Sequence, residues 1–110
     1  MDYTPIKDNR DFRRIYARGK NFVSPVVVCY VAKNRLKAVR VGITTSKRIG
    51  NAVKRNRARR VIRAAFQSLL PRIRPGCDLI FVARAKTPFV KSTAVARAMA
   101  QQLKKAGVWQ

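Results

Sequence analysis

Apolar residues recur at helical spacing in three segments of the chain. The first helix is predicted over 9–18, because Phe12, Ile15 and Tyr16 recur at i, i+3 and i+4 after the N-cap residue Asp8. The strongest pattern follows Asn51, also an N-cap residue, and ends at Pro71, with apolar positions within one arc of about 100°: Ala58, Val61, Ile62, Ala65 and Leu69. A last helix is predicted over 93–105, with Ser92 as its cap and apolar residues at every fourth position: Val95, Met99 and Leu103.

Alternating or continuous apolar runs predict the strands. They lie over 22–32, 39–45 and 78–85, and an additional short strand over 20–23 is compatible with the pattern. Only a few turn residues separate the first two long runs, so we expect these strands to be antiparallel neighbours. The elements predict an α/β fold of the α+β sandwich type, in the order α-β-β-β-α-β-α, with helices packed on one mostly antiparallel central sheet. A length of 110 residues fits a single domain, residues 1–110.

The balance of basic and acidic residues limits the classes of function that the protein can have. The chain carries 26 Lys and Arg against four acidic residues, a net charge of +22, and has no His. The acids are all aspartates, at positions 2, 8, 11 and 78, so there is no Glu. Acid–base catalysis and two-metal hydrolysis need His or converging carboxylates, so we expect no catalytic residue and no metal site built by the protein. So large a positive charge instead predicts a polyanionic partner, first of all nucleic acid.

The cysteines and the apolar runs indicate the cellular compartment in which the protein works. Cys29 and Cys77 are not at metal-ligand spacing, and without His they cannot form an ordinary zinc site. We expect two reduced thiols in a cytoplasmic protein. The longest apolar run, 26–32, is far shorter than the ~20 residues that span a bilayer. Membrane-surface binding ranks last, because the apolar stripes of the two long helices are expected to face a core.

Basic residues concentrate at one point of the chain. Between positions 47 and 63, eight of seventeen residues are Lys or Arg and none is acidic. Such a run is usually a solvated helix face, but here like charges at i and i+4 repel one another without any acid to relieve them. Six of the eight are arginine, whose planar fork suits bidentate phosphate contacts. The cluster therefore predicts an anionic partner along this helix.

Three aromatic residues allow two interpretations. Phe12 and Tyr16 share one face of the first predicted helix, and Tyr30 lies on the first long strand. Aromatic side chains in such places usually pack in a core. In a protein this basic, partly exposed rings also serve as stacking platforms for single-stranded bases. The pattern alone does not separate the two.

The stretch 41–63 closely resembles the signature of the bacterial ribonuclease P protein subunit. It reads VGITTSKRIGNAVKRNRARRVIR, and its Arg55-Asn56-Arg57 core matches the family's RNR element, preceded by Gly-Asn-Ala-Val as in the family. Three further segments are similar in order and spacing: Asp11 to Tyr16 followed by Gly19-Lys20, 27–30 and 78–84. The resemblance covers about residues 7–105.

The resemblance implies a fold and a role. It implies a left-handed crossover through the arginine-rich helix, opposite to the general rule for such units. It implies an endoribonuclease holoenzyme in which a catalytic RNA, with Mg²⁺ bound by the RNA and the substrate, removes the 5′ leader of precursor tRNA. The implied RNA-binding residues are Lys47, Arg48, Asn51, Lys54, Arg55, Asn56, Arg57, Arg59, Arg60 and Arg63. The implied leader-binding residues are Phe12, Tyr16, Val28 and Tyr30.

Two alternatives remain open at this point. A general RNA-binding structural protein, such as a ribosomal protein, fits the size and charge equally well, and only the motif decides against it. A nuclease in its own right fits the residue inventory poorly. We expect the protein to be a monomer in the absence of RNA.

Overall fold

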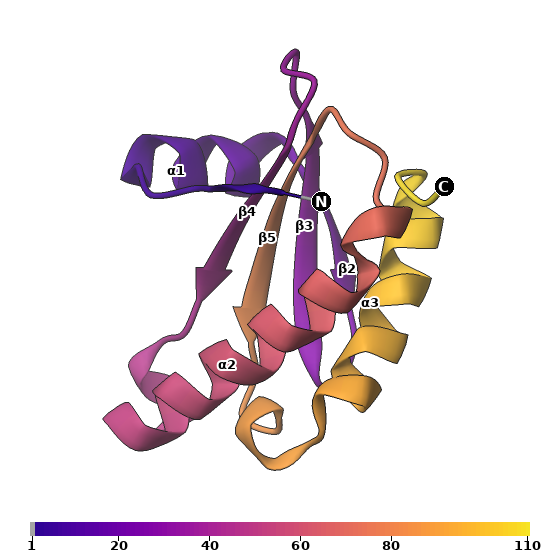
Figure 1. Ribbon diagram of the computed structural model, residues 1–110. Helices are drawn as coiled ribbons and strands as arrows, with labels where there is room; N and C mark the ends of the chain where they lie inside the picture. The colour runs from indigo at the N-terminus through magenta and orange to yellow at the C-terminus, as the bar shows by residue number, and fades with distance from the viewer. Residues whose placement is uncertain (1) are drawn as a thin grey trace.

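The computed structural model describes residues 2–110, which form one sheet of five strands and three α-helices (Figure 1). The strands are β1 (Thr4–Pro5), β2 (Lys20–Val23), β3 (Val27–Lys33), β4 (Val39–Thr44) and β5 (Cys77–Ala83). The helices are α1 (Asn9–Arg18), α2 (Ala52–Leu69) and α3 (Ser92–Ala106), and the short 3-10 turns are η1 (Lys47–Ile49), η2 (Leu70–Arg72) and η3 (Thr87–Phe89). The strand order across the sheet is β1-β4-β5-β3-β2.

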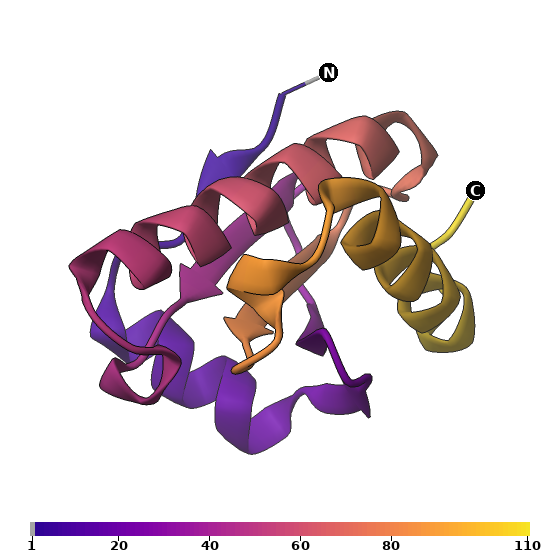
Figure 2. The same cartoon turned by 90° about the horizontal axis from the view of Figure 1, so that it is seen from below.

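The helices lie on opposite faces of the sheet. Figure 2 shows α2 and α3 on one face and α1 on the other. Residues of β5 alternate accordingly: Leu79 and Phe81 belong to the larger core beneath α2 and α3, whereas Ile80 joins Ile15 and Ile6 in a smaller core beneath α1. β5 is almost entirely buried because it is central and covered on both faces.

The predicted strand pairing is wrong. β3 and β4 are not neighbours, because β5 lies between them, antiparallel to β3 and parallel to β4. β1 is also parallel to β4, and β2 is antiparallel to β3, so the sheet is evenly mixed rather than mostly antiparallel. Periodicity identifies the face on which a residue lies, but it does not identify the neighbouring strand. The parallel strands β4 and β5 are joined through α2, and the left hand of that crossover stays a prediction.

The predicted helices and the optional strand 20–23 are confirmed, with changes at their ends. The Asp8 and Asn51 side chains accept hydrogen bonds from the backbone N–H groups of Arg10 and Lys54, as N-caps do. The predicted cap Ser92 is instead the first residue of α3 and follows Lys91, which makes no side-chain cap. Four residues of α2 are buried: the predicted Ala58, Ile62 and Ala65, together with Phe66, which the periodicity did not select.

Candidate RNA-binding site

The predicted RNA-binding residues lie along the first two-thirds of α2 and the turn before it. Lys47 and Arg48 are exposed on η1, and Asn51 uses its side-chain oxygen to accept from the Lys54 N–H at 3.0 Å. The exposed members on α2 itself are Lys54, Asn56, Arg57, Arg60 and Arg63, while Arg55 and Arg59 are half-buried. No described acidic side chain forms an ion pair with any of them, so their charges are not neutralised within residues 2–110.

Arg59 differs from the other arginines of α2 because it is tied to the sheet. Its guanidinium donates to the Ile43 carbonyl at 3.4 Å and to Thr45 Oγ1 at 3.0 Å. It also lines a pocket of about 310 Å³ between α2 and the β1–β4 edge, together with Arg63 and Phe66. Arg59 therefore fixes α2 to the end of β4 while part of its guanidinium stays at the surface.

The predicted leader-binding residues come together on the opposite face, beneath and beside α1. The strand registers arrange this face in three rows that run across β4, β5 and β3. The first row is Arg40, Asp78 and Ala32, the second is Gly42, Ile80 and Tyr30, and the third is Thr44, Val82 and Val28. The second row packs against α1, whereas every member of the third row is only half-buried. The third row is therefore a partly open strip with two valines on it.

The three aromatic rings are packed against one another at the border of that strip. The Tyr16 and Tyr30 rings lie edge to face with centroids 4.8 Å apart, and Phe12 lies 6.3 Å from Tyr16. The Tyr16 hydroxyl is 2.9 Å from Thr44 Oγ1, which anchors its ring beside the third row. Tyr16 is 37% exposed, whereas Phe12 and Tyr30 are half-buried. Phe12 and Tyr30 therefore pack as core residues do, whereas Tyr16 is exposed, and its role as a stacking platform stays a prediction.

Phe12 reaches the sheet because Gly42 has no side chain. A Cβ atom at position 42 would lie 2.7 Å from Phe12 Cζ, which is closer than carbon atoms approach. The ring therefore rests directly on the backbone of β4. This contact determines how closely α1 approaches the sheet at the second row.

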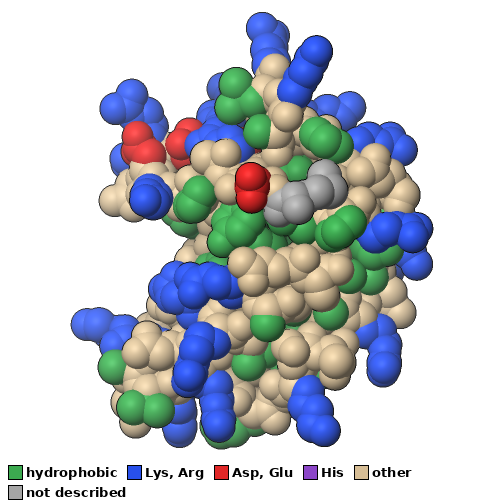
Figure 3. All heavy atoms as spheres, in the orientation of Figure 1, with side chains coloured by type: hydrophobic (Ala, Val, Ile, Leu, Met, Phe, Trp, Pro, Cys, Tyr) green, Lys and Arg blue, Asp and Glu red, His purple; other side chains and the backbone are tan. Residues whose placement is uncertain are grey.

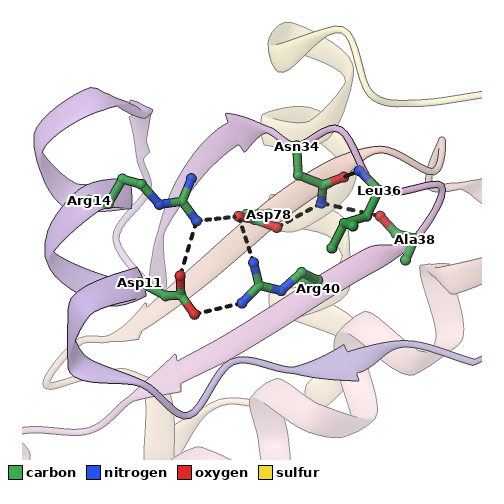
Figure 4. Close-up of polar contacts among 7 residues, drawn as sticks. All are labelled: Asp11, Arg14, Asn34, Leu36, Ala38, Arg40 and Asp78. Carbon is green, nitrogen blue, oxygen red and sulfur yellow. Dashed lines mark hydrogen bonds and ion pairs between the residues drawn. The ribbon is translucent and has the colours of Figure 1, made fainter.

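A buried carboxylate makes a second attachment between α1 and the sheet (Figure 4). Asp78 is fully buried and accepts from Arg14 at 3.1 Å, from Arg40 at 3.4 Å and from Asn34 Nδ2 at 2.7 Å. Asp11 closes a ring, because its carboxylate accepts from Arg40 at 2.7 Å and from Arg14 at 3.2 Å. The Arg40 hydrogen bond, with Arg14, lowers the pKa of Asp11, and the two aspartates raise the pKa of Arg14. We call Asp11, Arg14, Arg40 and Asp78 the four-residue ion-pair ring; it joins α1 to β4 and β5.

The two predicted surfaces lie on opposite faces of the sheet but meet at the edge of β4. β1 pairs only with Arg40 and Val41, so among residues 2–110 no strand covers the outer edge of β4 from Gly42 to Thr44. That edge carries Thr44 on the α1 face and the pocket with Arg59 and Arg63 on the α2 face. Figure 3 shows the surface hollowed between α1 and α2, with Lys and Arg side chains bordering the hollow.

Neither a metal centre nor a membrane span is found in the described part of the chain. Residues 2–110 contain no group of three or more His, Cys, Asp or Glu side chains that could hold a metal ion. Asp11 and Asp78, the two acids that lie close together, are both engaged by guanidinium groups. None of the described helices combines the length and the apolar character needed to cross a bilayer.

Sequence reasoning missed the residues that position the site. Thr44 and Val82 complete the third row, and Asp78 is the only acidic residue after position 11. A lone aspartate next to a continuous apolar strand is a signal for a buried ion pair. Its partners were not identifiable, because Arg14 and Arg40 are 64 and 38 residues away in the chain.

Comparisons with known proteins agree with this architecture. The family model described as Ribonuclease P matches residues 3–107. The chain is 34% identical to the ribonuclease P protein component of Clostridium botulinum (strain Loch Maree / Type A3) over 110 residues, which cover 99% of each protein. It is 41% identical to that of Clostridioides difficile (strain 630) over 83 residues, 74% of this chain and 73% of the relative.

Solved structures show the same fold. The Staphylococcus aureus RNase P protein superposes with a TM-score of 0.84 at 33% identity and covers 99% of this chain and 100% of its own. The Thermotoga maritima RNase P protein superposes with a TM-score of 0.80 at 26% identity and covers 96% of this chain and 97% of its own. Because the family model, the relatives and the solved structures all agree, the chain belongs to the ribonuclease P protein family. Members of this family are the protein subunits of the enzyme that matures the 5′ end of tRNA.

Proposed function

We propose that this subunit docks the catalytic RNA on α2 and holds the single-stranded 5′ leader of precursor tRNA on the α1 face. One observation carries the proposal: an uncompensated basic helix and a half-buried strip bordered by an exposed tyrosine meet at the uncovered edge of β4. An RNA bound along α2 and a strand bound beside Tyr16 would therefore come close together around that edge.

The strip has the dimensions and chemistry of a site for unpaired bases. Its row of Thr44, Val82 and Val28 crosses three strands, and two inter-strand spacings amount to about 10 Å. This width accommodates one or two bases lying flat on aliphatic side chains, with the Tyr16 ring at the border. Stacking of this kind tolerates any base, which a leader of variable sequence requires.

The basic helix has the properties of a phosphate-binding surface. The arginines of α2 are held at i and i+4 spacing, where like charges cost a few tenths of a kcal/mol per pair. Among the described residues no acid relieves this repulsion, so phosphate groups remove a cost that the free protein carries. Arg59 is already oriented by Ile43 and Thr45, which lowers the entropy lost when it contacts RNA.

The protein contributes position and charge, and the RNA contributes the chemistry. The described residues offer no ligand set for Mg²⁺, so in this proposal the RNA and the substrate hold that ion. The catalytic RNA and precursor tRNA are the partners, and the protein is a cytoplasmic monomer in the absence of RNA. Its role is to reduce repulsion between two RNAs and to select substrates that carry a leader.

Cleavage of a precursor tRNA by a bacterial ribonuclease P RNA at low Mg²⁺, with and without this protein, tests the proposal. We expect site-specific 5′ cleavage with the RNA and protein together, and none with the protein alone. A protein that binds the RNA without promoting cleavage would overturn the subunit role.

The leader site has its own test in the same assay. Tyr16→Ala removes the exposed ring, and we expect weaker holoenzyme binding of precursor tRNA but unchanged binding of mature tRNA. Tyr16→Phe keeps the ring and loses only the contact to Thr44, so it serves as the matched control. Equal losses for both tRNAs would contradict the assignment of the leader to the α1 face.

A further inference from the structure

A second exposed aromatic side chain lies on the other face of the molecule, beside α2. Phe89 is 68% exposed at the end of η3, the turn that follows β5. Lys54 Nζ of α2 lies 5.6 Å from the centre of its ring, within cation–π range. A single exposed apolar side chain is common on a protein surface, so the evidence for a bound partner is the rigid support of this ring and the cations around it.

The turn that carries Phe89 is rigid because its other two residues are buried. The Thr87 side chain is fully buried, donates to the Val26 carbonyl at 2.6 Å and accepts from the Arg84 N–H at 2.8 Å. Pro88 is buried as well and restricts the backbone of the turn. The Phe89 ring is therefore presented from a fixed support, which lowers the entropy cost of stacking on it.

The surroundings of Phe89 are basic and contain no acid. Lys54 and Arg57 are exposed on α2 and Lys91 is exposed just after η3. Arg57 and Lys91 line one open hollow of about 340 Å³ between α2 and the start of α3. The chain has no acidic residue after Asp78 and none from 12 to 77. We call Lys54, Arg57, Phe89 and Lys91 the Phe89 surface.

We propose that the Phe89 surface binds an unpaired nucleotide of the catalytic RNA, with a base stacked on Phe89 and phosphates at Arg57 and Lys91. An aromatic ring among cations is the combination that recognises single-stranded nucleic acid. The precursor leader is a poor candidate, because its proposed strip is on the opposite face of the sheet. The inference rests on the proposed function, since Lys54 and Arg57 belong to the helix that docks the same RNA.

Affinity of the full-length protein for a bacterial ribonuclease P RNA tests this inference. Phe89→Ala should weaken binding by about 5- to 150-fold, the range for loss of one stacked base. Phe89→Trp should restore it, and Phe89→Leu, which keeps apolar area without a ring, should not. Val53→Ala is the control, because Val53 is 73% exposed at the same end of α2 but has no ring. Thermal unfolding checks that each variant is folded.

Salt dependence separates stacking from charge. Phe89→Ala should leave the slope of log affinity against log salt unchanged, whereas Arg57→Ala should make it shallower by about one. Binding by Phe89→Ala within twofold of wild type, or by Phe89→Leu equal to wild type, overturns the inference. A loss seen with precursor tRNA but not with the catalytic RNA overturns the choice of partner. Should the wild-type protein bind the RNA without promoting cleavage, the proposed function fails, and the affinity ratio still decides this inference.

Discussion

Replacing Asp78 with Asn should destabilise the protein without changing its shape. The amide keeps an oxygen for Asn34, but its NH₂ group would face the guanidinium groups of Arg14 and Arg40 in place of Oδ2. Two hydrogen bonds to charged groups are lost, at about 1.5–3 kcal/mol each. Because Arg14 is 39% exposed and regains water, its share must be discounted, and we expect a total loss of about 2–4 kcal/mol.

Urea unfolding followed by circular dichroism measures this loss. Urea is preferable to guanidinium chloride because it does not screen the charges under test. The buffer should contain chloride as the only anion, since phosphate or sulfate binding to the basic helix would stabilise the native state and mask the effect. Asp8→Asn is the matched control: it removes one negative charge at the start of α1, the helix that the ring attaches to the sheet, and Asn caps as well as Asp.

The control also defines the result that refutes the reasoning. Both variants raise the net charge by one, so the difference between them reports the ion-pair ring alone. A free energy of unfolding for Asp78→Asn within about 0.5 kcal/mol of that for Asp8→Asn would show that the buried carboxylate does not hold α1 to the sheet. A double-mutant cycle with Arg40→Met should give a coupling energy of at least about 0.5 kcal/mol.

Four other predictions follow from the packing and the charge. Gly42→Ala should cost about 1–3 kcal/mol in urea unfolding, because the new methyl group displaces Phe12; an unchanged midpoint would mean that α1 adjusts freely. Affinity for the catalytic RNA should fall with salt at a slope of about −5 to −9, and a slope shallower than about −2 would exclude α2 as the docking surface. Burial raises the pKa of Cys77 to about 11 and also raises that of Cys29, so both thiols should resist a disulfide reagent at pH 8 until urea unfolds the chain. The raised pKa also means that the free energy of unfolding should fall as pH rises from about 9 to 11, because the thiols ionise in the unfolded chain over this range but stay protonated in the folded one. Rapid labelling of the native protein at pH 8 would contradict both statements, since it would show that the thiols are accessible and reactive.

The sequence was sufficient for the three helices and the four longer strands, but it did not predict the two-residue strand β1 or the order of the strands in the sheet. Cap residues and periodicity located α1 and α2 because these signals are local, acting within a few residues. The pairing of β5 with both β3 and β4 was missed, since hydrophobic alternation carries no information about neighbours. The continuous apolar run 79–83 was nevertheless a usable signal, because a strand buried on both faces is usually central.

The same limit applies within the site. Strand alternation places Val28 on the same face as Tyr30, two residues away, and the register agrees. The positions of Thr44 and Val82 beside Val28 depend on the order of strands, which no local pattern encodes. Family resemblance implied roles for α2 and α1, which stay predictions, and it gave no indication that the two surfaces meet at the edge of β4.

The central position of β5 also determines when the chain can fold during synthesis. Residues 77–83 are the last strand to be synthesised, yet in the sheet that residues 2–110 form they are the strand between β3 and β4. At about 5–20 residues per second, the interval between the end of β4 and the end of β5 lasts roughly 2–8 seconds. Throughout that interval the chain is strongly basic and incompletely folded. The arginine helix is therefore complete in the chain before the sheet that supports it.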